Sequence, residues 1–348
     1  MSFLHVIAPY SDPSSRAMLG LLKIVTQRLP KKHNVIVLGD ADLAIQLRMQ
    51  DFSVLGSVQG ITNNSHTLGM RVRRAVEAVT TRKDKLIAWG WTPTIAISGI
   101  DCVHQTVAYV DSIDATTTPT IEVDCVIPTT WTCSDRLKEN KRSSYVVTEP
   151  LVGIDAQSLV IDPTSVLHAL NISRKTLLVA VVNDIGMWEE IVAFIVQMKA
   201  LGEDIALVVS NNYLYYAELH FALQEHGLVN SLHQVAQGLR LIDVAHVATC
   251  IWAPSSTVHG KLEGVLDVLS ASASGVPVAA SHKHAVSGVP TIGNRIAWVT
   301  SVSELAAWVM ALWKESSDIS DQGLELAARL RSIASPSRFV EGLQLRLQ

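Results

Sequence analysis

The chain has 348 residues, of which 48% are apolar and 17% are charged. Because a common domain has roughly 150 residues, this length predicts about two domains with separate cores and excludes a small disulfide-stabilised peptide. The charged fraction lies below the roughly 25% of an average soluble chain, so intrinsic disorder is also excluded. A formal net charge of −4 gives no overall positive field, and we expect no nucleic-acid partner.

The cysteines and the apolar segments indicate the cellular compartment of the protein. The four cysteines are far apart and form no CxxC pair, so we expect ordinary reduced thiols (Cys102, Cys125, Cys133 and Cys250). The first segment reaches Pro9 and Asp12 before any signal-like apolar run. No later stretch approaches the about 18 uninterrupted apolar residues of a membrane span. We therefore expect a cytoplasmic protein with neither an export signal nor a transmembrane segment.

Short apolar runs alternate with helical patterns in the first 150 residues, which is typical of β-α-β units around a parallel sheet. The runs predict strands at residues 3–8, 34–38, 85–88, 105–110 and 125–127. Apolar residues at helical spacing predict one helix that begins at Ser14 or Ser15 and ends before Pro30. A second predicted helix, 67–81, carries Arg71, Arg73 and Arg74, which form either a solvated face or a phosphate-binding cluster.

A second β-α series follows a strand-like run at 145–148 and a connector with Pro150 and Gly153, where we place the domain boundary. Strands are predicted at 175–182, 205–209, 250–253 and 278–280. Helices are predicted at 188–201, 215–226, 241–247, 264–273, 302–315, 322–332 and 337–347. The pattern predicts an α/β protein built from two Rossmann-like domains.

Residues 239–290 resemble the donor-site region of retaining glycosyltransferases of the GT-B fold, of the family 4-like type also called glycosyl transferases group 1. Ala253-Pro254-Ser255-Ser256 matches a Pro-Ser loop of that family, and Ala273-Ser274-Gly275-Val276-Pro277-Val278 matches its helix-to-strand turn. Gly153-Ile154-Asp155 matches the end of the interdomain link, and residues 335–347 resemble the terminal helix. The resemblance covers nearly the whole chain.

The resemblance implies the GT-B fold, with two Rossmann-like domains facing across a cleft. It implies an acceptor-side domain at 1–150, a donor-side domain at 151–332 and a terminal helix, 333–348, that returns to the first domain. We expect a hinge between Pro150 and Asp155. A helix entered from the Ser-rich loop would offer free backbone N–H groups and a positive dipole end to a diphosphate.

The resemblance also implies the positions of a donor site. Polar residues that end strands or begin helices in the second domain are expected to bind the nucleotide sugar: Asn183, Asp184, Asn211, Asn212, Ser255, Ser256 and Ser270. The family has two glutamates eight positions apart, whose register falls here on Leu262 and Ser270. Glu263 takes the first place after a one-residue slip and is the expected catalytic carboxylate. Ser270 is a weaker substitute for the ribose-binding glutamate, because a hydroxyl lacks the charge-assisted hydrogen bond.

One departure from the family concerns the donor diphosphate. The family has an Arg and a Lys after the strand predicted at 175–182, whereas this chain has Asp184, Glu189 and Glu190. A leaving diphosphate needs positive groups or a metal, so carboxylates there act against catalysis. A second departure is Val110, which stands where the family often has a His.

Two functions therefore stay open. The first is an enzyme of the hexosyltransferase type, which transfers a sugar from a nucleotide-sugar donor to an unknown acceptor and needs no further cofactor. The second is a catalytically inactive GT-B protein that acts as a binding, regulatory or scaffold subunit with a protein partner. The donor sugar, the nucleotide, the acceptor and the oligomeric state are not determined by the sequence.

Other motifs contain residue types that can do chemistry. Trp89-Gly90-Trp91 either stacks on a sugar ring or a partner, or packs in the core. His282 and His284 form an HxH pair, and His259 is the nearest further histidine. The pair has no third ligand at a fixed spacing, so we expect no metal site. The sequence has no P-loop, no GxGxxG after a strand and no GxSxG elbow.

Overall fold

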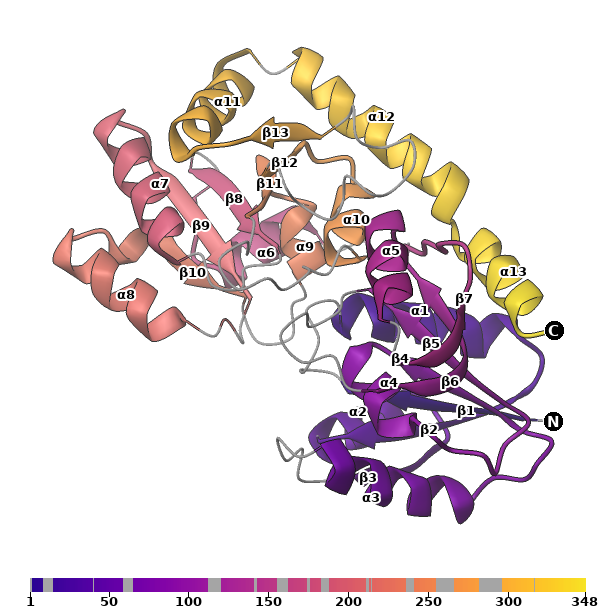
Figure 1. Ribbon diagram of the computed structural model, residues 1–348. Helices are drawn as coiled ribbons and strands as arrows, with labels where there is room; N and C mark the ends of the chain where they lie inside the picture. Colours follow the sequence, from indigo (N-terminus) through magenta and orange to yellow (C-terminus); the bar gives the residue numbers. More distant parts are fainter. Residues whose placement is uncertain are drawn as a thin grey trace. The chain divides into compact units, whose positions relative to one another are not determined.

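The computed structural model contains two parallel β-sheets, each flanked by helices (Figure 1). It describes residues 2–8, 15–39, 41–58, 65–111, 120–140, 143–154, 162–173, 176–182, 188–210, 213, 215–235, 241–254, 266–281, 296–315 and 317–348. The chain forms two compact units. Unit 1 comprises Met1–Asp155, Gly264–Leu266 and Pro336–Gln348, and unit 2 comprises Ala156–Glu263 and Asp267–Ser335.

The sheet of unit 1 has seven parallel strands in the order β3-β2-β1-β4-β5-β6-β7. Parallel pairing places all the carboxyl ends at one edge, and β1 and β4 are in register from Phe3 with Lys85 to Ile7 with Trp89. The strands are β1 Ser2–Ile7, β2 Lys32–Leu38, β3 Val54–Val58, β4 Lys85–Trp89, β5 Gln105–Val110, β6 Glu122–Pro128 and β7 Ser144–Val147. The helices are α1 Ser15–Arg28, α2 Ala41–Met49, α3 Ser65–Glu77, α4 Trp91–Ile97, α5 Trp131–Glu139 and α13 Pro336–Arg346.

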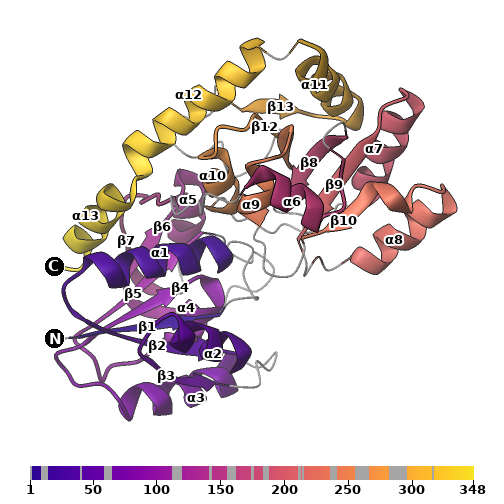
Figure 2. The same ribbon diagram turned by 180° about the vertical axis from the view of Figure 1, so that it is seen from behind.

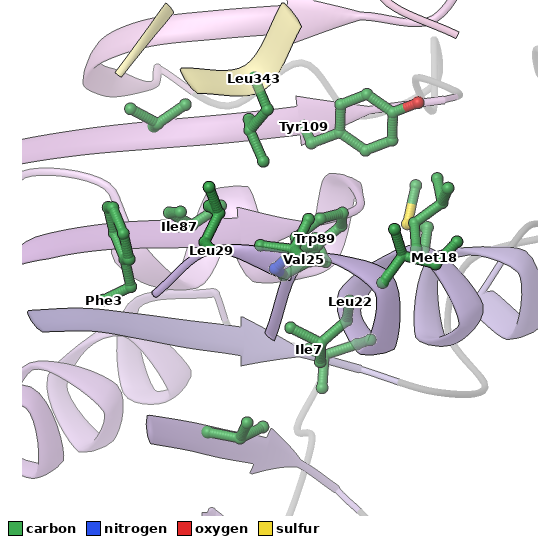
Figure 3. Close-up of a cluster of buried hydrophobic side chains, with 14 of the residues drawn as sticks. Phe3, Ile7, Met18, Leu22, Val25, Leu29, Ile87, Trp89, Tyr109 and Leu343 are labelled. Carbon is green, nitrogen blue, oxygen red and sulfur yellow. The ribbon is translucent and has the colours of Figure 1, made fainter. Parts of the chain in front are cut away.

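The main core of unit 1 lies between its sheet and the helices α1, α2 and α13. Alternate strand residues supply the sheet side, because successive side chains point to opposite faces. Phe3 and Ile7 of β1 and Trp89 of β4 belong to this face, and α1 covers it with Met18 and Leu22 (Figure 3). Figure 2 shows α1 and α13 side by side, and both contribute buried residues to this core.

The sheet of unit 2 has six parallel strands in the order β10-β9-β8-β11-β12-β13. The strands are β8 Leu177–Val181, β9 Ile205–Val209, β10 Leu232–Gln234, β11 Cys250–Ala253, β12 Val278–Ser281 and β13 Ala297–Val299. The helices are α6 Pro163–Ala169, α7 Trp188–Ala200, α8 Tyr216–Glu225, the short 3₁₀ helix η1 Val229–Ser231, α9 Leu241–Ala245, α10 Leu266–Ser272, α11 Val302–Glu315 and α12 Ser317–Ala334. The first residue of α10 groups with unit 1 and the rest with unit 2.

Both faces of this second sheet are covered. Helices α7, α8 and α11 pack on one face, with Phe194 and Trp252 at 5.4 Å between ring centroids. Helices α6 and α9 pack on the opposite face with Val166 and Val244. Every residue of β8 and β9 is buried, which explains why their sequences, LLVAV and IALVV, are continuous apolar runs.

The connector after β7 packs against α13 within unit 1. The guanidinium of Arg346 donates to the Oγ1 of Thr148 at 3.3 Å and to the carbonyl of Glu149 at 3.0 Å. A Cβ added to Gly153 would lie 2.6 Å from Leu21 and 2.7 Å from the ring of Phe339. Glycine is therefore required there by close approach, and the connector is part of the core of unit 1 up to Ile154, which is fully buried.

The structure differs from the predicted elements at several places. The strand predicted at 175–182 is β8, which spans only Leu177–Val181, and the helix predicted at 322–332 is the longer α12. The sequence pattern missed β3, β10 and β13, as well as α2, α4, α5 and α6. β10 and β13 have three residues each, and β3 and β13 have few buried residues, so the three missed strands lack the apolar runs that marked the central strands.

Candidate functional site

The order of strands defines one point in unit 2 where a ligand is expected. Numbered along the chain, the six strands are arranged 3-2-1-4-5-6, so the order reverses between β8 and β11. In open parallel sheets, ligands bind outside the carboxyl ends of the strands at such a reversal, because the following loops diverge there. The strands β8 and β11 pair directly, Val179 with Cys250 and Val181 with Trp252. Beyond the last pair, the N–H of Val182 donates to the carbonyl of Trp252 at 2.9 Å.

Most residues of the predicted donor site lie outside the described residues. This holds for Glu263 and for Asn183, Asp184, Asn211, Asn212, Ser255 and Ser256. Their positions in the chain are nevertheless informative. Asn183 follows β8 by two residues, Ser255 follows β11 by two, and β8 and β11 are the strands that flank the reversal. Asn211 follows β9, the next strand of the sheet. The role of each of these residues stays a prediction.

Ser270 is the member of the predicted set that the structure describes. It lies in α10 with 5% of its surface exposed. After α10, Gly275 has a φ of 93°, so the turn before β12 uses the left-handed conformation that favours glycine. On the other side of this turn, α12 packs through Gly323, where an added Cβ would lie 2.9 Å from the nitrogen of Pro277. The helix-to-strand turn seen in the sequence is thus a tightly packed element.

The electrostatics of unit 2 are unfavourable for an anion. Unit 2 has 16 acidic and 10 basic residues, which gives it a formal charge of −6. Helix α7, which follows β8, carries Glu189 and Glu190 in its first turn. These carboxylates interact favourably with the positive end of the helix dipole and oppose a second anion there. A diphosphate at this edge would therefore need its charge balanced by groups elsewhere in the site.

The carboxyl edge of unit 1 has its own polar cluster. Asp111, directly after β5, is 2% exposed, and its Oδ1 accepts a hydrogen bond from the Oγ1 of Thr129 at 2.7 Å. Its Oδ2 accepts from the backbone N–H of Leu266, the first residue of α10, at 3.3 Å. Because Leu266 belongs to unit 1, this contact lies within unit 1. The N–H of Leu266 is thus bonded to a carboxylate. The residues that lead into this helix, 255–265, lie outside the described residues, so diphosphate binding at this helix end stays a prediction.

Near Asp111, the phenol of Tyr109 and the thiol of Cys133 are held in their neutral forms. Burial raises the pKa of Tyr109 well above its ordinary value, and the negative charge of Asp111 raises it further. The Tyr109 hydroxyl donates to the carbonyl of Leu151 at 3.0 Å. Burial also raises the pKa of the Cys133 thiol, again with Asp111 as a second cause. Neither group is poised for nucleophilic chemistry at neutral pH.

The other motifs have structural explanations. Trp89 is fully buried and Trp91 is 4% exposed, so neither ring presents a face to a sugar. Arg71, Arg73 and Arg74 lie exposed on α3, and the Arg73 guanidinium donates to the carbonyl of Gly99. The four cysteines are free. The described residues bring together no group of three His, Cys, Asp or Glu side chains able to hold a metal ion. His259, His282 and His284 lie outside the described residues.

Comparisons with known proteins agree on the fold. The chain is similar to Anabaena HepE in complex with UDP-glucose, with a TM-score of 0.76, 13% sequence identity, and coverage of 100% of this chain and 99% of that one. It is similar to sucrose-phosphate synthase from Thermosynechococcus elongatus, with a TM-score of 0.74, 12% identity, and coverage of 100% and 98%. It is also similar to the UDP-GlcNAc 2-epimerase of Neisseria meningitidis, with a TM-score of 0.59, 11% identity, and coverage of 100% and 98%.

These likenesses and the two parallel sheets show that the chain has the GT-B fold, an α/β architecture of two Rossmann-like domains. No family model matches the sequence, and no curated protein matches it. At identities of 11–13%, the structural likeness establishes the fold alone. Among the described helices, none is long and apolar enough to cross a membrane.

Proposed function

We propose that the chain is a glycosyltransferase-like protein that binds a nucleotide-sugar donor at the carboxyl edge of the sheet in unit 2. The observation that carries this proposal is the reversal of strand order between β8 and β11, followed in the chain by Asn183 and Ser255 respectively. Neighbours of the same fold, solved with UDP-glucose and with UDP and glucose, support the chemical class of the ligand. On this proposal the acceptor is bound by unit 1.

Within this proposal, the roles follow the resemblance to retaining, family 4-like enzymes. Asn183, Asp184, Ser255 and Ser256 would bind the phosphates and the sugar, while Asn211 and Asn212 would bind the base. The Ser270 hydroxyl would accept or donate a hydrogen bond at the ribose, in place of a glutamate. Glu263 would supply the carboxylate beside the transferred sugar. The protein would act in the cytoplasm, in keeping with four free cysteines.

A second candidate function is favoured by the charges after β8. Residues 183–190 contain three carboxylates and no Lys or Arg, and unit 2 as a whole is acidic. An enzyme that releases a nucleoside diphosphate needs to stabilise about two negative charges at that point. A GT-B protein that has lost this ability can still bind a ligand or a protein partner and act as a regulatory or scaffold subunit. The UDP-GlcNAc 2-epimerase among the neighbours also shows that this fold is not confined to transferases.

Ligand binding separates the two candidates. The full chain is heated with UDP, GDP, ADP, dTDP and their sugar derivatives, and the unfolding temperature is recorded. A ligand that binds only the folded state adds about 2.7 kcal/mol of stability at 100 times its Kd. We expect one nucleotide series to raise the unfolding temperature in a concentration-dependent way. No shift with any nucleotide would contradict the donor site and leave the second candidate.

Variants then test the site itself. On this proposal, Asn183→Ala and Ser255→Ala should weaken the nucleotide-induced shift, because each removes a polar side chain that follows β8 or β11 in the chain. Ser303→Ala is the matched control, since Ser303 is exposed on α11 of the same unit. Release of nucleoside diphosphate, with and without a panel of sugar acceptors, is followed by mass spectrometry. An active wild type whose turnover is unchanged in Glu263→Gln would exclude the catalytic role of Glu263.

A further inference from the structure

A chain of hydrogen bonds in the core of unit 1 links three strands and one helix. The indole Nε1 of Trp89 in β4 donates to the Nδ1 of His5 in β1 at 3.0 Å. The Nε2 of His5 lies 2.9 Å from the Nδ1 of His33 in β2. The Nε2 of His33 lies 3.0 Å from the carbonyl oxygen of Leu29, just after α1. We call these four residues the imidazole chain.

The direction of every bond in the imidazole chain is fixed by its two ends. An indole N–H can only donate, so the Nδ1 of His5 carries no proton and its Nε2 carries one. The Nε2 of His5 therefore donates to the Nδ1 of His33. A carbonyl can only accept, so the Nε2 of His33 donates to Leu29. Both imidazoles are neutral, in the same tautomer, and three N–H groups fill three contacts.

This arrangement has no place for another proton. A proton added to either imidazole gives four N–H groups for the same three contacts, so one contact must hold two donors facing each other. The contact with Leu29 always takes one N–H, which means that the broken contact is either Trp89 with His5 or His5 with His33. Burial lowers the pKa of His5, with His33 as a second cause. Burial also lowers the pKa of His33, partly offset by the bond to Leu29.

The surroundings provide little compensation for a buried imidazolium. On this face of the sheet, β4 contributes the ammonium of Lys85, which donates to Gln105 and to the carbonyl of Leu347, and β5 contributes the neutral Tyr109. Asp111 lies at the carboxyl end of β5, two strands away from β1. The described charged side chains on the covering helices are Lys23 and Arg28 of α1, Asp42 and Arg48 of α2, and Arg338, Glu341 and Arg346 of α13. Arg28 donates to Ser337, and Arg346 donates to Thr148, Glu149 and Gly342.

Trp89 gives the imidazole chain a connection to the rest of unit 1. It is the last residue of β4, and it packs against Tyr109 at 5.5 Å and against Phe339 of α13 at 6.5 Å between ring centroids. Figure 3 shows Trp89 near Val25 of α1, and Tyr109 on a neighbouring strand near Leu343 of α13. Directly after Trp89, Gly90 adopts a φ of 100° at the reversal of strand order between β1 and β4.

We propose that the imidazole chain is an acid-sensitive switch. Uptake of one proton breaks the contact of His5 with either Trp89 or His33, and this loosens the carboxyl end of β4. The proton enters at His33, which is half-buried, whereas His5 is fully buried. When His33 takes the proton on Nδ1, His5 must accept at Nε2 and moves its own proton to Nδ1, where it meets the indole N–H of Trp89. The switch concerns unit 1 alone and does not depend on the proposed function.

Nuclear magnetic resonance of the full chain tests the switch directly. Long-range ¹H–¹⁵N spectra report the tautomer of each imidazole, and His5 and His33 are assigned by loss of their signals in His5→Gln and His33→Gln. The indole N–H of Trp89, one of eight in the chain, is assigned with Trp89→Phe. At pH 8 we expect both histidines to be neutral with the proton on Nε2. On acidification, the Trp89 signal should shift together with them, with a midpoint below the ordinary histidine value of about 6.5.

Two results would overturn the proposal: an Nδ1–H tautomer at either histidine, or a Trp89 signal that stays constant while His5 and His33 titrate. His33→Gln provides a second test, because its amide can accept from His5 and donate to Leu29 but does not titrate. In that variant the Trp89 transition should move to lower pH, and an unchanged transition would contradict the switch. His104→Gln, at an exposed position, is the matched control and should leave the transition unchanged. If His33→Gln does not fold, the tautomers and the titration of the two histidines in the wild type still test the switch.

Discussion

The two units share an order of strands and differ in what fills their cores. Unit 1 buries ten polar or charged residues among those described, including His5, Asp84, Lys85 and Asp111, whereas unit 2 buries four. The central strands of unit 2 are wholly apolar, and its one buried charged residue among those described is Asp243. The comparison teaches that the same order of strands can have many buried polar groups beside its apolar core, as in unit 1, or few, as in unit 2. We therefore expect unit 1 to respond to pH and unit 2 to respond to side-chain volume.

The two units also differ in formal charge. Unit 1 has 18 basic and 16 acidic residues, a formal charge of +2, against −6 for unit 2. A nucleotide sugar bound to unit 2 would meet an unfavourable field, while an anionic acceptor bound to unit 1 would not. Thus the half of the fold expected to bind the donor carries the less suitable charge. This is the main physical argument for the inactive alternative.

The largest expected effect comes from removing volume in unit 2. Phe194 in α7 is fully buried against Trp252, so Phe194→Ala should lower the free energy of unfolding by about 3 to 5 kcal/mol. Urea unfolding measures the loss, and hydrogen–deuterium exchange assigns it to the strands of unit 2. Phe221→Ala, at a ring that is 63% exposed on α8, should change stability by less than about 0.5 kcal/mol. A similar loss in both variants would show that burial of the Phe194 ring against Trp252 is not the cause of the effect.

The second prediction concerns pH and unit 1. Hydrogen bonds from the backbone and side chains of Ser2 and Thr81 outweigh burial and lower the pKa of Asp84 to about 2. Because the folded pKa is depressed, this contribution is present above about pH 4 and is lost as the pH falls toward 2. A difference of about two between the unfolded and folded pKa values corresponds to about 2 to 3 kcal/mol in the free energy of unfolding. Asp84→Asn should therefore destabilise the protein by about 2 kcal/mol at pH 7, and the difference from wild type should shrink toward pH 2.

Urea unfolding between pH 2 and pH 7 measures this effect. Asp135→Asn is the control, because Asp135 is exposed on α5 and its ion pair with Lys138 spans 3.9 Å at the surface. The control should differ from wild type by less than about 0.5 kcal/mol at every pH. A loss at Asp84→Asn that does not change with pH would show that packing, and not the charge, stabilises this end of β1 and β4.

The smallest expected effect tests whether the connector belongs to the core of unit 1. Gly153→Ala places a Cβ within 3 Å of Leu21 and Phe339, which must move to make room. We expect a loss of about 1 to 2 kcal/mol, together with faster exchange of the amides of α13. Gly56→Ala in β3 is the matched control, because its Cβ would meet no atom within 4 Å, and it should be neutral or slightly stabilising. Equal stability of the two variants would mean that the connector is not packed in the way described.

The sequence by itself determined the fold class and most of the central strands. Continuous apolar runs such as 177–181 and 205–209 occur because these strands are covered on both faces, and this pattern needs no knowledge of neighbours. Three of the four edge strands among the described residues, β3, β10 and β13, were missed for the converse reason. β3, for example, has no fully buried residue and contains Gly56, so its sequence lacks a strand signal. For the donor site, the sequence named residues that follow β8, β9 and β11, and their roles remain predictions.

Only the tertiary structure decided which residues depend on one another. His5, His33 and Trp89 are far apart in the sequence, and nothing in their local patterns joins them. Parallel pairing of β1 with β2 and β4 places them on one face of the sheet, where burial makes each nitrogen need a partner. Likewise, the order of strands that defines the candidate site arises from long-range pairing. Periodicity reports which side of an element is buried, but the partner across the sheet is chosen by the whole fold.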